Sequence, residues 1–261
     1  GMTPGADLPP REYLPLARFN TTGDQDLEPD PKRDKWCTTL AGAMGRSINT
    51  VFARLAARNL NRDKLVDVAE RLGWGQDVPF DVPVATSRLN IPEDELGFAR
   101  TAAGFWNTTL SPFQAANLAT TVANSGEMIR LHVVRSVKDE SGELYRGPTE
   151  RQVVRRAIGE EIARAVTVMM EDTVDNGTSY RSFHDKSGRP YLPDIRVAGK
   201  TGTLTKPTPE GPFYTWFTGF APSRKPEVAI SVLVAGAGCV PVPAAAPGDE
   251  RHPADEVEQR A

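Results

Sequence analysis

Helical patterns come first in this chain, and β-strand patterns come last. Four stretches place apolar side chains at the three- and four-residue spacing of a helix: 40–59, 61–72, 112–124 and 158–174. Three strand-like runs follow: 195–204, 214–221 and 228–235. The last two runs are separated by a connection of hairpin length, so their strands are expected to be antiparallel. This order predicts an α+β fold in which a helical subdomain packs on one side of an antiparallel sheet.

Cap residues indicate where two of these helices begin. Asn61 is expected to cap the second helix by accepting a backbone hydrogen bond. The side chains expected on its buried face are Leu65, Val66, Val68, Ala69 and Leu72. Ser111 and Pro112 indicate the start of the third helix, and Gln114 is expected to complete a capping box with Ser111.

Charge and reactive side chains exclude several classes of protein. The net charge is -3, so there is no electrostatic basis for nucleic-acid binding. No run of 18 apolar residues occurs, and the sequence therefore predicts no membrane-spanning helix. Cys37, Cys239 and the three histidines lack metal-ligand spacing, so we expect no metal and no other cofactor. The two cysteines are expected to be free thiols, with a disulfide between them left open.

Three segments differ in composition. Residues 1–35 are rich in proline and acidic residues and are expected to form an irregular N-terminal segment. Residues 36–238 are expected to form the folded domain, and residues 239–261 a disordered tail rich in Pro, Ala, Asp and Glu. The first two residues resemble a tag remnant followed by a start methionine, and no leader sequence follows them.

The strand expected at 195–204 contains the motif Lys200-Thr201-Gly202-Thr203. Lys200 would place a cation beside an active-site hydroxyl group, and the two threonines offer hydroxyls to a carboxylate. Gly202 leaves room for a substrate backbone to lie along the strand, as extended peptides do at sheet edges. The same letters also occur by chance in ordinary strands. The spacing of a phosphate-binding loop is absent.

A second motif, Ser47-Ile48-Asn49, directly precedes a helical pattern. A serine or asparagine at such a place is most often a helix cap. The pair of motifs is more specific than either alone, because Ser-x-Asn followed by Lys-Thr-Gly is the order found in penicillin-recognising serine enzymes.

Further stretches extend the resemblance to one family. They are Gly45–Phe52, Leu110–Ala116, Ala123–Gly126, Asp175–Thr178 and Thr215–Pro222. Over roughly residues 36–235, in the family's order, the chain resembles the transpeptidase domain of high-molecular-weight penicillin-binding proteins. The resemblance implies a β-lactamase- or transpeptidase-like fold with a cleft between the sheet and the helical subdomain.

The resemblance also implies roles for individual residues. In this family a serine attacks a D-Ala-D-Ala peptide or a β-lactam and forms an acyl-enzyme during peptidoglycan synthesis. Ser47 would relay a proton to the leaving nitrogen, and Lys200 would support Ser47 electrostatically. The expected substrate contacts are Asn49 for the substrate amide, Thr201 and Thr203 for its carboxylate, and Gly202 and Trp216. The implied location is extracytoplasmic, in the periplasm or cell envelope.

The family's nucleophile is the serine of a Ser-x-x-Lys motif that precedes Ser-x-Asn. None of the eleven serines in the 261 residues is followed by lysine at the third position. The Thr-x-x-Lys sequence at 203–206 lies after Lys-Thr-Gly and cannot replace it. We therefore expect that this chain alone does not acylate, and that its fold is incomplete on the N-terminal side.

Three interpretations stay open. The chain could be the second part of an active D,D-transpeptidase whose start was trimmed or misassigned. It could be a non-catalytic relative that binds a peptidoglycan stem peptide or a cell-wall partner protein. It could also be an interaction module whose open sheet edge recruits a second copy or a partner chain. The sequence leaves open the stem peptide, the oligomeric state and the origin of the missing motif.

Overall fold

The computed structural model describes residues 14–16, 23–205 and 213–236. The helices are η1 (Asp24–Asp26), α1 (Leu40–Gly45), α2 (Asn49–Asn59), α3 (Arg62–Arg71), α4 (Glu95–Ala102), α5 (Pro112–Ala123), α6 (Glu160–Asp175) and α7 (Tyr180–Phe183). The strands are β1 (Leu14–Leu16), β2 (Trp36–Thr38), β3 (Glu127–Ile129), β4 (Ser136–Asp139), β5 (Gly142–Arg146), β6 (Val153–Arg156), β7 (Ala198–Thr205), β8 (Phe213–Ala221) and β9 (Val228–Gly236). The α+β class expected from the sequence is confirmed.

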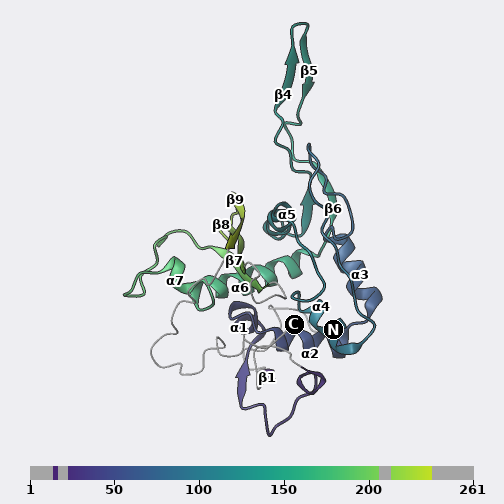
Figure 1. The fold of residues 1–261 in the computed structure, drawn as a ribbon. Helices are drawn as coiled ribbons and strands as arrows, with labels where there is room; N and C mark the ends of the chain where they lie inside the picture. Colours follow the sequence, from purple (N-terminus) through teal and green to yellow (C-terminus); the bar gives the residue numbers. More distant parts are fainter. Residues whose placement is uncertain (1–13, 17–22, 206–212, 237–261) are drawn as a thin grey trace.

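The largest described sheet is antiparallel and has the order β7-β8-β9. Helices α5 and α6 cover one of its faces (Figure 1). Ala198 and Phe220 of this face are buried against Ala119 of α5 and Met170 of α6. β7 and β9 are the two edge strands of this sheet, so one backbone edge of β7 is not paired with another described strand.

The opposite face of this sheet carries an exposed row of apolar side chains on β9. The row consists of Val228, Ile230, Val232 and Val234, which are between 45% and 59% exposed. Val232 lies opposite Phe217, which in turn lies opposite Thr201. The Thr201 side of β7 therefore shares a face with this apolar row.

Helices α1 and α2 pack against α6 around Ile48, Val51 and Met169, which are all buried. The described part of the segment before them packs against α2 and α4. It pairs β1 with β2 and buries Leu27 against these two helices. The buried guanidinium of Arg54 donates to the Asp26 carbonyl at 2.6 Å and also hydrogen-bonds to a carboxylate of this segment. Residues 239–261, expected to be a disordered tail, lie outside the described residues.

The expected helix starts are only partly right. Asn61 and Ser111 cap α3 and α5 by accepting the backbone N–H three residues later. The capping box is wrong, because the Gln114 side chain donates to the Leu72 carbonyl at 2.6 Å instead of closing on Ser111. The buried face expected for α3 is also wrong in part, since Val68 is 37% exposed.

The continuous helical pattern at 40–59 is divided into α1 and α2 by a turn at residues 46–48. Among the described residues, no helix combines the length and apolarity that a bilayer span requires. The strands β4 and β5 form a hairpin that projects far from the rest of the molecule (Figure 1). At its base, the Asp81 carboxylate accepts the backbone N–H groups of Val133 and Val134 at 2.8 and 2.9 Å.

Candidate active site

Ser47 lies in the turn between α1 and α2 with a left-handed backbone. Its φ is 57°, a value that few residues other than glycine adopt. The turn is held by backbone hydrogen bonds from Ser47 N to Met44 O and from Ile48 N to Ala43 O. The Ile48 side chain is buried in the core. Such a conformation persists only where the surrounding packing imposes it, which makes Ser47 a candidate functional residue.

Lys200 on β7 reaches Ser47 in the turn between α1 and α2. Its Nζ donates to Ser47 Oγ at 2.9 Å and to the Thr201 carbonyl at 2.7 Å. Because Ser47 Oγ accepts this bond, its own proton is free to donate elsewhere. The two motifs singled out in the sequence thus meet at one pair of side chains.

The ammonium group of Lys200 is poorly solvated. Burial lowers the pKa of Lys200 from 10.5 to about 8. In the described part of the chain, no carboxylate forms an ion pair with it, so the charge is held mainly by the Ser47 and Thr201 oxygens. A lysine with such a pKa can exchange a proton near neutral pH and can also attract an anionic ligand.

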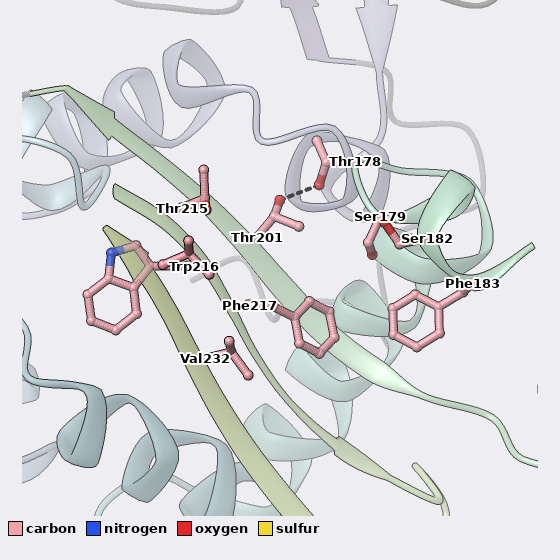
Figure 2. Close-up of a pocket in the computed structure, with 10 residues that line it drawn as sticks. Thr178, Ser179, Ser182, Phe183, Thr201, Thr215, Trp216, Phe217 and Val232 are labelled. Carbon is pink, nitrogen blue, oxygen red and sulfur yellow. Dashed lines mark hydrogen bonds between the residues drawn. The ribbon is translucent and has the colours of Figure 1, made fainter. Parts of the chain in front are cut away.

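Thr201 lies next to Lys200 with its side chain on the other face of β7. Its hydroxyl group forms a hydrogen bond with the hydroxyl of Thr178, which lies in the turn between α6 and α7 (Figure 2). The backbone N–H of Thr178 donates to the Gly45 carbonyl at 2.9 Å. Thr178 therefore contacts both the strand with Lys200 and the helix end that leads into Ser47.

Thr178 was not among the expected site residues. The only sequence signal for it was the Gly-Thr pair that follows the long helix. Nothing in that pair indicates a contact with Thr201, which is 23 residues away along the chain. The contact arises from the way in which α6 packs beneath β7 (Figure 1).

The other expected site residues lie around this centre. Asn49 is half-buried at the first position of α2, two residues after Ser47. Thr203 is exposed on β7 and shares a face with Thr201. Gly202 pairs with Trp216 on β8, and a Cβ at Gly202 would lie 3.4 Å from the Trp216 Cβ, which is an ordinary van der Waals contact.

A pocket of about 260 Å³ opens beside Thr201. Its hydroxyl-lined side is formed by Thr178 and Thr201, and its apolar side includes Phe183, Phe217 and Val232 (Figure 2). The two phenylalanine rings pack with their centroids 5.5 Å apart. The Trp216 ring points away from the Thr178–Thr201 pair, so this tryptophan borders the pocket without facing those hydroxyls. The pocket offers hydroxyl groups beside an apolar surface, which suits a carboxylate attached to an apolar group.

No cluster of His, Cys, Asp or Glu side chains that could hold a metal ion occurs within the described ranges. Cys37 is exposed on β2, and Cys239 lies outside those ranges.

Comparison with known proteins points to one family. Residues 10–253 match the model of the penicillin-binding protein transpeptidase domain. A peptidoglycan D,D-transpeptidase of Mycolicibacterium smegmatis, PbpA, is 28% identical over 234 residues, which are 88% of this chain and 44% of that protein. The curated relative PbpA of Mycobacterium tuberculosis is also 28% identical, over 78% of this chain and 40% of its own length. The chain thus spans less than half the length of these relatives.

Solved structures with a similar fold come from the same family. The crystal structure of penicillin-binding protein A from M. tuberculosis superposes with a TM-score of 0.63 at 27% identity, covering 80% of this chain and 44% of that one. A penicillin G acyl-enzyme complex of the same mycobacterial protein gives the same TM-score and coverage. The D,D-transpeptidase domain of an Eggerthella lenta peptidoglycan glycosyltransferase superposes with a TM-score of 0.64 at 25% identity, covering 79% of this chain and 50% of that one.

Proposed function

This chain belongs to the family of penicillin-binding protein transpeptidase domains, and we propose that its cleft recognises the D-Ala-D-Ala end of peptidoglycan stem peptides and the β-lactams that resemble it. The observation that carries this proposal is the 2.9 Å contact between Lys200 Nζ and Ser47 Oγ, which joins two motifs 153 residues apart. The names of the relatives support it, since they are D,D-transpeptidases and one is an acyl-enzyme with penicillin G. The proposed location is extracytoplasmic, where peptidoglycan is assembled.

Each residue of the cleft has a proposed task. Thr201 and Thr203 donate hydrogen bonds to the ligand carboxylate, and the Lys200 ammonium adds electrostatic attraction. Gly202 allows an extended peptide to lie along the β7 edge, whose backbone groups pair with it. Asn49 holds the substrate amide.

Ser47 is proposed to move a proton. Its hydroxyl accepts a hydrogen bond from Lys200 and therefore keeps its own proton available. It can pass that proton to a leaving nitrogen and recover one from Lys200, whose pKa of about 8 allows the exchange. In this scheme Ser47 and Lys200 serve as proton carriers and do not form the covalent bond.

The covalent step needs a nucleophile that these 261 residues do not contain as Ser-x-x-Lys. We propose that this chain binds its ligand reversibly and does not acylate by itself. A protein that carries the motif in addition to these residues would have the full set of groups for acyl transfer. Removing a nucleophile abolishes most of the rate enhancement, while binding by the remaining groups survives.

A second candidate is a non-catalytic relative that binds a stem peptide or a cell-wall partner protein. The exposed row of apolar side chains on β9 favours this alternative, because four such residues on one strand suit a protein contact. A second copy of the chain is another candidate partner for this apolar row on β9.

The test is to incubate the chain with a fluorescent penicillin, then measure fluorescence anisotropy and intact mass. We expect saturable binding and an unchanged mass. The control variant Lys138→Ala, on the projecting hairpin, should bind as the wild type does, whereas Lys200→Ala should bind more weakly. A mass increase equal to the penicillin would contradict the proposal of reversible binding, with Ser47 the first residue to examine. Absence of binding would favour the partner-binding alternative.

A further inference from the structure

A closed ring of contacts joins the Ser47 turn to β7, and Thr178 forms one side of it. Lys200 contacts Ser47, and its neighbour Thr201 contacts Thr178. The Thr178 backbone contacts the Gly45 carbonyl, two residues before Ser47. The ring therefore connects the Ser47 turn to β7 twice, once through a side chain on each face of the strand.

The backbone that carries Thr178 is held tightly against the end of α1. A Cβ at Gly177 would lie 2.1 Å from the Gly45 carbonyl oxygen, so only glycine fits there. A Cβ at Gly45 would lie 3.1 Å from the Asp172 backbone carbon of α6. Next to Thr178, Ser179 is buried and its Oγ donates to the Thr173 carbonyl at 3.0 Å. Close packing at these points leaves Thr178 little freedom to move away from β7.

The hydrogen bonds around Thr178 favour one direction for its proton. The Gly45 carbonyl already accepts the Thr178 N–H, and it lies 3.4 Å from the Thr178 hydroxyl, which is long for a hydroxyl donor. The Thr201 oxygen is closer. When Thr178 donates to Thr201, the hydroxyl proton of Thr201 stays on its oxygen and can point into the pocket that both hydroxyls line.

We propose that Thr178 is a positioning residue for ligand recognition: its hydroxyl group donates to Thr201 and thereby aims the Thr201 proton at the ligand carboxylate. This inference rests on the proposed function, because it assumes that Thr201 binds a carboxylate. Hydrogen bonds in a chain polarise one another, so the bond from Thr201 to an anion is strengthened by the bond that Thr201 accepts. Thr178 thus acts through Thr201 and needs no contact with the ligand.

The experiment measures the binding of penicillin G to the 261-residue chain by competition with a fluorescent penicillin. Thr178→Val removes the hydroxyl but keeps the shape of the side chain, and we expect about five- to tenfold weaker binding, as for the loss of one hydrogen bond. Thr178→Ser keeps the hydroxyl and should bind within about twofold of the wild type. Thermal unfolding checks that each variant is folded, and Thr178→Ala replaces the valine variant if that one is not.

A double-mutant cycle tests whether the effect passes through Thr201. In a Thr201→Val background, Thr178→Val should cause no further loss, because the proton that it orients is gone. The matched control is Thr120→Val on α5, which loses a hydroxyl outside the pocket lining and should not change binding in either background. The methyl ester of penicillin G, which lacks the carboxylate, should bind wild type and Thr178→Val equally.

Two results would overturn the inference while leaving the proposed function intact. One is wild-type affinity in Thr178→Val, and the other is full additivity of Thr178→Val with Thr201→Val. A wild-type chain that binds neither penicillin would refute the proposed function itself, and this inference with it.

Discussion

Lys200 allows the electrostatics of the cleft to be measured without any ligand. Its pKa is about 8 in the folded protein and 10.5 as the unperturbed value, with burial as the cause. Between these two values the unfolded chain holds the Lys200 proton more often than the folded protein does, so the contribution of this lysine to stability rises with pH. The linkage relation gives a rise of about 2 kcal/mol in the free energy of unfolding from pH 7 to pH 9.5.

The variant Lys200→Met tests this value, because methionine has similar length and no titratable group. Over this pH range we expect the free energy of unfolding to change by about 2 kcal/mol less favourably in Lys200→Met than in the wild type. Every other group titrates alike in both proteins, so it cancels in the difference. Guanidinium unfolding followed by tryptophan fluorescence at the two pH values measures both slopes.

A control variant separates this effect from the general loss of a lysine. Lys138→Met removes an exposed lysine from the projecting hairpin, and it should keep the wild-type dependence on pH. If the free energies of unfolding of Lys200→Met and the wild type changed in parallel with pH, the reasoning that burial lowers the pKa of Lys200 would be wrong.

Three further results are expected. Gly177→Ala should lower the free energy of unfolding by about 2 kcal/mol, because its Cβ would meet the Gly45 carbonyl. The control Gly159→Ala, with no atom within 4 Å of the new Cβ, should stay within about 1 kcal/mol of the wild type. Thermal unfolding measures both. Ser47→Gly should be about 1 kcal/mol more stable than Ser47→Ala, since both lose the hydroxyl but only glycine adopts a φ of 57° without strain; equal denaturation midpoints would argue against strain at this turn. Penicillin G should bind more weakly as the pH rises through about 8, because Lys200 loses its charge. An affinity that does not change between pH 7 and pH 9.5 would exclude this electrostatic contribution.

Rules that act within one helical turn were sufficient to place several elements. Asn61 and Ser111 cap their helices because the side chain and its N–H partner are only three residues apart. The three C-terminal strands follow from runs of residues that fit a pleated surface. The meeting of Ser47 with Lys200 could be expected only through the family resemblance, since nothing local relates positions 153 residues apart.

The wrong expectations share a physical cause, which is contact between distant elements. Apolar spacing continues through Ser47, but the burial of Ile48 against α6 favours a break in the helix there. Gln114 could close a capping box, yet the Leu72 carbonyl at the end of α3 is a partner that lies 42 residues away in sequence. Thr178 joined the site for the same reason, because its partners come from α1 and β7.

The projecting β4–β5 hairpin bears on how this protein can be altered. Every residue of its two strands is exposed, and the Asp139 carboxylate stabilises its tip by accepting the N–H groups of Ser141 and Gly142. Exposed tips of this kind tolerate insertion, because lengthening them disturbs no buried backbone. A fluorescent reporter or a protease site placed after Glu140 is therefore expected to leave the cleft intact. The hairpin can vary in length and sequence between relatives independently of the chemistry beside Lys200.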